Sequence, residues 1–124
     1  MESAISTPYA SIFEIDKTQE PSESHFYKTM SDVLVTVAEH YNQPNTDDIY
    51  MGYVEVASLI LNLSDMCTNP MHEKSDLAEV KKMIQNEYKL LIQDLTYHFE
   101  SYPDEITKRD IEVGKILIDG FNII

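Results

Sequence analysis

Two histidines of this sequence have a carboxylate one helical turn away, and these pairs are the first candidates for chemistry. His72 precedes Asp76 by four positions, and Asp94 precedes His98 by the same spacing. Such a pair can hold a metal ion on one face of a helix. Di-iron bundle proteins, however, repeat Glu-x-x-His on two helices, and this sequence contains no Glu-x-x-His, no His-Glu-x-x-His and no EF-hand loop. We therefore favour structural or surface roles for the histidines and expect no metal site and no cofactor.

Cys67 is the only cysteine, so no internal disulfide can form and a reducing compartment fits best. A nucleophilic cysteine needs a base and an orienting group nearby. His72 follows five residues later, but nothing else marks the two as a pair. A free cysteine at the end of an apolar helix usually behaves as a small apolar residue, and we favour that interpretation.

Two pairs of adjacent carboxylates, Asp47-Asp48 and Asp104-Glu105, could in principle serve general acid–base catalysis. That chemistry needs two carboxylates in different environments across a cleft. Adjacent acids in the first turn of a helix instead complement the positive end of the helix dipole. The glycines are isolated, so no phosphate-binding loop is present either. We expect a protein that is not an enzyme and has no catalytic residues.

The distribution of charge says most about function. The chain carries 22 acids against 9 bases, a net charge of -13 at pH 7, whereas a small soluble domain usually has a magnitude of about 2–8. Residues 29–73 contain no Lys or Arg at all. Such a field repels nucleic acid and anionic membranes, and it attracts basic surfaces. We therefore expect a basic protein partner such as a toxin or nuclease, with no direct nucleic-acid binding and no membrane binding.

The same region supplies the residues that we expect to contact this partner. Tyrosine gives rigid contact area and a hydroxyl, so tyrosines among acids make an effective docking surface. In the alternative interpretation, the tyrosine rings complete the core while their hydroxyls reach solvent. The predicted partner-binding residues are Asp32, Glu39, Tyr41, Asp47, Asp48, Tyr50, Tyr53 and Glu55.

Apolar residues recur at spacings of three and four between breaks rich in Pro and Asn, which is typical of amphipathic helices. We predict helices near residues 22–42, 46–66, 75–101 and 103–119, with Thr46 capping the second and Ser101 the fourth. Four helices joined by short polar breaks predict an all-α fold, a four-helix up-down bundle. The expected core residues are Ile49, Val56, Ile60, Ile84, Leu91, Leu95, Val113 and Leu117.

The first 21 residues differ from the rest of the chain. They are rich in small polar residues and contain one short apolar patch with Ile12, Phe13 and Ile15. We predict a flexible N-terminal arm over residues 1–21 and a bundle domain over residues 22–124. The apolar patch could also dock on the bundle or pair with a partner.

The leading functional hypothesis is an acidic helical protein that binds and inhibits or regulates a basic macromolecule. An immunity or antitoxin-like inhibitor and a nucleic-acid mimic are the concrete versions. The alternative is a self-associating structural protein, a secretion chaperone or an assembly subunit, and it includes a homodimer. The sequence shows no secretory signal and no apolar stretch near the about 20 residues that span a bilayer, so we expect a cytoplasmic protein.

Overall fold

The computed structural model of the chain describes residues 9–13, 22–69, 71 and 73–119, and it is all-α over these residues. The elements in chain order are α1 (Ala10–Phe13), α2 (Ser22–Glu39), the 3₁₀ turn η2 (Pro44–Thr46), α3 (Asp47–Thr68), α4 (Lys74–Ser101) and α5 (Glu105–Ile118). The predicted fold class is confirmed, and the four long helices begin and end within a few residues of the predicted ranges.

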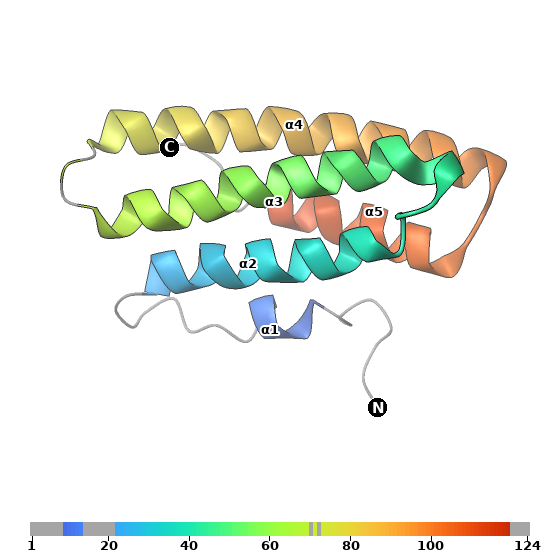
Figure 1. The fold of residues 1–124 in the computed structure, drawn as a ribbon, viewed down its shortest axis with the longest axis horizontal. Helices are drawn as coiled ribbons and strands as arrows, with labels where there is room; N and C mark the ends of the chain where they lie inside the picture. Colours follow the sequence, from blue (N-terminus) through green and yellow to red (C-terminus); the bar gives the residue numbers. More distant parts are fainter. Residues whose placement is uncertain (1–8, 14–21, 70, 72, 120–124) are drawn as a thin grey trace.

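The four long helices lie along the long axis of the molecule and form a four-helix bundle (Figure 1). Each helix packs against the next one in the chain, α2 on α3, α3 on α4 and α4 on α5. The α2–α3 and α4–α5 connections therefore lie at the same end of the bundle, as Figure 1 shows. Residues near Glu39, Asp47 and Tyr102 are brought to this one end.

Helix α3 lies in the middle of this arrangement and contributes much of the core. It has apolar side chains on two stripes, and it contacts both α2 and α4. All of the predicted core residues are buried, which confirms that part of the sequence analysis: Ile49, Val56, Ile60, Ile84, Leu91, Leu95, Val113 and Leu117.

Polar contacts also join α2 to α3. The Ser31 hydroxyl donates to the carbonyl of Ala57 at 2.7 Å. The Ser64 hydroxyl donates to the carbonyl of Ser24 at 2.8 Å, and the two serine hydroxyls lie 3.1 Å apart. These bonds satisfy polar groups inside the helix interface, where an unpaired hydroxyl would be costly.

The helix starts differ from the predicted caps in two places. Thr46 occupies the cap position of α3, but its hydroxyl donates to the carbonyl of Tyr41 at 2.7 Å and caps nothing. At α5 the cap is Asp104, whose carboxylate accepts from the Ile106 N–H at 3.0 Å. Ser101 instead ends α4. Since Asp, Ser and Thr all make good caps, the sequence alone does not select among neighbouring candidates.

Part of the predicted flexible arm is docked on the bundle. Helix α1 packs against α2, and the side chains of Tyr9 and Ile12 are fully buried. Residues 9–13 therefore take the docked position that the sequence analysis allowed for the apolar patch, because these two side chains cover apolar surface. Flexibility of the arm stays a prediction. Phe13 belongs to α1, and Ile15 lies outside the described residues.

Among the residues that the structure describes, none of the helices is both long enough and apolar enough to cross a membrane.

Candidate functional site

The predicted docking acids all lie on the surface. Asp32 and Glu39 are exposed on α2, and Asp47, Asp48 and Glu55 are exposed on α3. We call these five residues the acidic face. The ion pairs among the described residues involve Glu23, Asp104 and Asp110. None of the five residues of the acidic face therefore forms an ion pair with another described residue. Their charges therefore act on whatever approaches from solvent.

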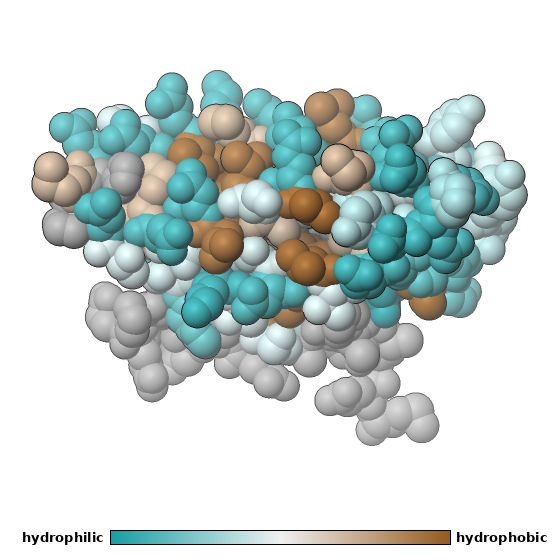
Figure 2. Space-filling view, in the orientation of Figure 1, coloured by the Kyte–Doolittle hydropathy of each residue, from teal (hydrophilic) through white to brown (hydrophobic). Residues whose placement is uncertain are grey.

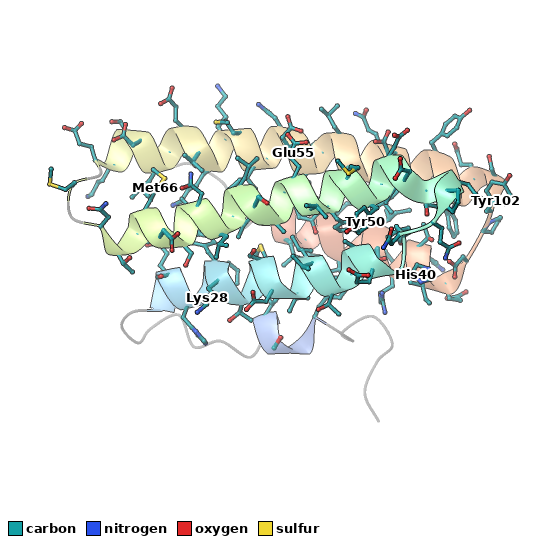
Figure 3. The ribbon with its side chains drawn as sticks, viewed as in Figure 1. Lys28, His40, Tyr50, Glu55, Met66 and Tyr102 are labelled. Atoms are coloured by element: carbon teal, nitrogen blue, oxygen red, sulfur yellow. The ribbon has the colours of Figure 1, made fainter. Side chains whose placement is uncertain are left out.

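The acidic face includes the end of the bundle where α2 turns into α3. Glu39 ends α2, and Asp47 and Asp48 form the first turn of α3 after the short η2 turn. Lys28, a base on α2, lies toward the other end of that helix, whereas His40 lies at the turn (Figure 3). Negative charge is therefore concentrated where the chain reverses.

Two of the three predicted tyrosine anchors are not on the surface. Tyr41 is 1% exposed and Tyr53 is fully buried, and their rings stack with centroids 5.6 Å apart. Neither can touch a partner in this structure, so the prediction is corrected for both. The positions of Tyr41 and Tyr53 in the helical pattern suit the core as well as a docking surface. The large apolar area of a tyrosine ring favours the core. Tyr50 is half-buried at the edge of the core.

The buried tyrosines surround an aspartate that the sequence analysis did not single out. Asp110 on α5 is fully buried, and its carboxyl oxygens accept from the Tyr9 hydroxyl at 2.6 Å and from the Tyr41 hydroxyl at 2.5 Å. The neighbouring Arg109 guanidinium lies 3.0 Å from the same carboxyl group and 5.5 Å from the centre of the Tyr9 ring. This cluster joins α5 to the residue that precedes α1 and to the turn that follows α2.

Two further tyrosines lie close to this cluster, and their hydroxyls have no hydrogen-bond partner among the described residues. They are Tyr53 and Tyr88, both fully buried. Burial raises the pKa of both phenols, and the nearby Asp110 raises them further. The same two causes raise the pKa of Tyr9 and Tyr41. All four phenols therefore stay protonated at neutral pH, and none serves as a base.

The contacts of this cluster therefore hold the fold together and do not provide a catalytic base. Its tyrosines can donate hydrogen bonds but cannot take up protons from a substrate. Cys67 is similarly inert, because burial and then the nearby Glu23 raise the pKa of its thiol and so lower the fraction of reactive thiolate. No described group in these places has the properties of an activated nucleophile.

A pocket of about 370 Å³ opens at the end of the bundle that carries the acidic face. Its lining comes from the η2 turn, the start of α3, the end of α4 and the residue after α4. The lining residues are Asn45, Thr46, Asp48, Ile49, Asp94, Tyr97, His98, Ser101 and Tyr102. Tyr102 lies at the tip of the molecule beside the turn into α5 (Figure 3). We call this cavity the α3–α4 pocket.

Only one of the two predicted His–Asp pairs lies wholly within the described residues. Asp94 and His98 both line the α3–α4 pocket, whereas His72 lies outside the described residues. No three His, Cys, Asp or Glu side chains in the described part of the chain are grouped so that they could hold a metal ion. The expectation that the protein binds no metal stays a prediction.

Comparison of the chain with protein-family models, with curated proteins and with solved structures finds no match.

One feature of the sequence does point to the buried aspartate. On α5 the apolar residues Ile106, Val113 and Leu117 follow a spacing of seven and four, and Asp110 occupies the missing position between the first two. A carboxyl group on an apolar stripe predicts a buried polar contact. Its partners could not be predicted, because Tyr9 lies 101 residues away in the chain.

Proposed function

We propose that this protein is a non-enzymatic acidic helical protein that binds a basic protein partner and inhibits or regulates it. The observation that carries the proposal is the acidic face, whose five carboxylates are exposed and make no ion pair with the described residues. An inhibitor of a toxin or nuclease, with carboxylates standing where the phosphates of a nucleic acid would lie, is the version that best fits the charge.

The physical basis is electrostatic attraction over a distance. A patch of one sign raises the local concentration of an oppositely charged partner and speeds its association. Lys28 is far along α2 from the α2–α3 turn, so it does little to neutralise that end (Figure 3). Repulsion by the same field disfavours nucleic acid and anionic membrane as ligands.

Affinity capture from the native host, eluted by a salt gradient, tests the proposal. The bait is compared with Asp47→Asn/Asp48→Asn/Glu55→Gln and with Glu79→Gln/Glu87→Gln/Glu112→Gln, which removes the same number of charges from α4 and α5. We expect the unmodified chain and the α4–α5 variant to retain a basic protein that the acidic-face variant releases at lower salt. Equal retention by both variants would contradict the proposal.

Self-association is the second candidate, and a specific observation favours it. Met83, Leu90 and Tyr97 on α4 are exposed and follow one another at intervals of seven, so they form one apolar stripe on the outside of the bundle. Apolar side chains also gather along the middle of the molecular face in Figure 2, between hydrophilic ones. Sedimentation equilibrium of the chain and of Leu90→Glu tests this function, which predicts an oligomer that the substitution dissociates.

A further inference from the structure

We propose that the α3–α4 pocket receives an arginine side chain of the basic partner. The inference deepens the proposed function, and it rests on that function because it names the group through which the partner is anchored. The η2 turn and the start of α3 line one side of the pocket, and the end of α4 with the residue after it lines the other. Both sides carry polar and acidic groups, whereas all of the aromatic rings come from the α4 side.

The lining residues of the pocket differ in exposure. Thr46 and Ile49 are buried, and the Thr46 hydroxyl is already used in a bond to the Tyr41 carbonyl at 2.7 Å. Asp48 on α3 and Asp94 on α4 also line the pocket, and both are exposed. Neither carboxylate has an ion-pair partner among the described residues. A cation entering the pocket therefore meets two carboxylates from opposite helices.

Two large aromatic rings stand open to solvent beside these acids. Tyr97 is 76% exposed and Tyr102 is 62% exposed, although the other described tyrosines are buried or half-buried. The ring of His98 packs against that of Tyr102 with centroids 5.3 Å apart, which positions the tyrosine at the pocket. An exposed ring can bind a cation over its face, and this attraction strengthens as water is excluded.

The helix ends add to the preference for a cation. The last turn of α4, which carries His98 and Ser101, presents the negative end of the helix dipole to the pocket. The positive end of α3 lies on the other side, but Asp47 and Asp48 occupy its first turn and offset it. The net field of the pocket is therefore negative.

Arginine fits these features better than a metal ion or a lysine. No three metal-binding side chains of the described residues are grouped together, and the pocket volume of about 370 Å³ is far larger than an ion needs. A guanidinium group is planar, stacks on an aromatic ring and forks to a carboxylate, whereas an ammonium is a strongly hydrated point charge.

Nuclear magnetic resonance of the ¹⁵N-labelled full chain tests the inference with two blocked tripeptides, Gly-Arg-Gly and Gly-citrulline-Gly. Citrulline has the shape of arginine without its charge. We expect saturable shifts at residues 45–49 and 94–102 with the arginine peptide and none with the citrulline peptide. Shifts spread evenly over all exposed acids, or equal shifts with citrulline, would overturn the inference.

Matched variants separate the contributions of ring and charge. Tyr102→Phe keeps the ring and should retain binding, whereas Tyr102→Leu should weaken it by about threefold to tenfold, as the loss of a cation–π contact implies. Asp48→Asn/Asp94→Asn should weaken it further, while Glu79→Gln/Glu87→Gln on α4 should not. If Asp48→Asn/Asp94→Asn binds the arginine peptide as tightly as the unmodified chain, the inference is contradicted, because these carboxylates provide most of the electrostatic attraction in the pocket.

The outcomes distinguish this inference from the proposed function. Arginine-peptide binding in the pocket without capture of any basic protein supports the pocket and counts against the function. Capture of a basic protein that is unaffected by Tyr102→Leu and Asp94→Asn, with no peptide shifts at the pocket, supports the function and overturns the pocket.

Discussion

At the scale of single residues, the buried Asp110 explains why several polar groups lie inside the bundle. Its carboxyl group accepts two tyrosine hydroxyls and pairs with Arg109. A buried carboxyl group is tolerated only when its oxygens are satisfied. The apolar stripe of α5 therefore carries one polar residue because Tyr9, Tyr41 and Arg109 are placed around it.

Tyr41→Phe tests this role. The substitution keeps the ring and removes the hydroxyl that donates to Asp110 at 2.5 Å, so one carboxyl oxygen loses a donor. We expect the free energy of unfolding to fall by about 1.5–3 kcal/mol, the usual range for a hydrogen bond to a charged group. Urea denaturation measures the change, and Tyr50→Phe is the control because Tyr50 is only half-buried. Similar effects of the two substitutions would show that the Asp110 contact contributes little.

Asp104 gives a pH-dependent prediction. Partial burial acts to raise the pKa of this carboxyl, but hydrogen bonds from the Ile106 N–H and the Thr107 hydroxyl, with His40 3.6 Å away, outweigh burial and lower the pKa. A folded-state pKa below the unfolded value means that the carboxylate stabilises the fold above its unfolded pKa. That contribution is lost as the pH falls through the lower, folded value.

Asp104→Ala should therefore lower stability at neutral pH by about 0.5–2 kcal/mol, as for other helix caps. Asp104→Asn should retain most of the cap, because its side-chain oxygen can still accept from the Ile106 N–H. The difference between the unmodified chain and the alanine variant should shrink as the pH falls below about 4, where the carboxyl of the unfolded chain is protonated first, and should be smallest below the lower, folded pKa. Thermal unfolding across pH measures this, and a difference that is constant down to strongly acidic pH would exclude the ionised cap.

At the scale of helices, two glycines mark close approaches of different kinds. A Cβ at Gly52 would lie 2.9 Å from Cδ1 of Leu91, the flexible end of that side chain. A Cβ at Gly114 would meet Ile92 at 3.0 Å and the buried ring of Tyr88 at 3.2 Å. The second site has less freedom to adjust, since a buried ring is held on several sides.

We expect Gly114→Ala to destabilise the protein and Gly52→Ala to be close to neutral. Alanine improves helix propensity by about 1 kcal/mol at either position, but overpacking costs about 1–3 kcal/mol where neighbours cannot move. Urea denaturation of the two variants gives the comparison. A Gly52→Ala variant that loses more stability than Gly114→Ala would contradict the packing around α4.

The docked α1 gives a third prediction at this scale. Deleting residues 1–13 removes Tyr9 and Ile12 from the core, and full burial of an aliphatic side chain such as Ile12 stabilises a fold by about 1.5–3 kcal/mol. We expect the deletion to lower the free energy of unfolding by at least that amount and Ile12→Ala to account for much of it. A deletion without effect on stability would contradict the docked position of α1 and support a flexible arm.

The long helices and their core could be predicted from the sequence because period and breaks are local features. Residues such as Ile60 and Leu91 lie where the pattern places them. The periodic pattern does not show how deeply a tyrosine is buried. Tyr41 and Tyr102 both lie near helix ends, but Tyr41 is buried and Tyr102 is exposed. The α3–α4 pocket likewise depends on which helix ends meet, and that is decided by long-range packing.

At the scale of the whole molecule, the net charge of -13 is unevenly distributed along the chain. The second half of the chain mixes acids with bases, and Lys81 pairs with Glu23 across α4 and α2 at 3.3 Å. The acidic face has no such neutralisation among the described residues. A partner would therefore be guided toward the acidic face, which extends from the α2–α3 turn to Glu55 near the middle of the bundle and has the α3–α4 pocket at its turn end (Figure 3).

The rate of association with the captured basic partner, measured by stopped flow as ionic strength is raised, tests this account most directly. We predict fast association at low salt that slows steeply as salt is added, as in electrostatically steered complexes. Asp47→Asn/Asp48→Asn/Glu55→Gln should reduce the low-salt rate by about tenfold and flatten the salt dependence, while Glu79→Gln/Glu87→Gln/Glu112→Gln should change both much less. Stability is checked in parallel, because Asp47 and Asp48 also favour the start of α3. A rate and a salt slope that respond equally to the two variants, both remaining folded, would show that overall charge and not the acidic face governs binding.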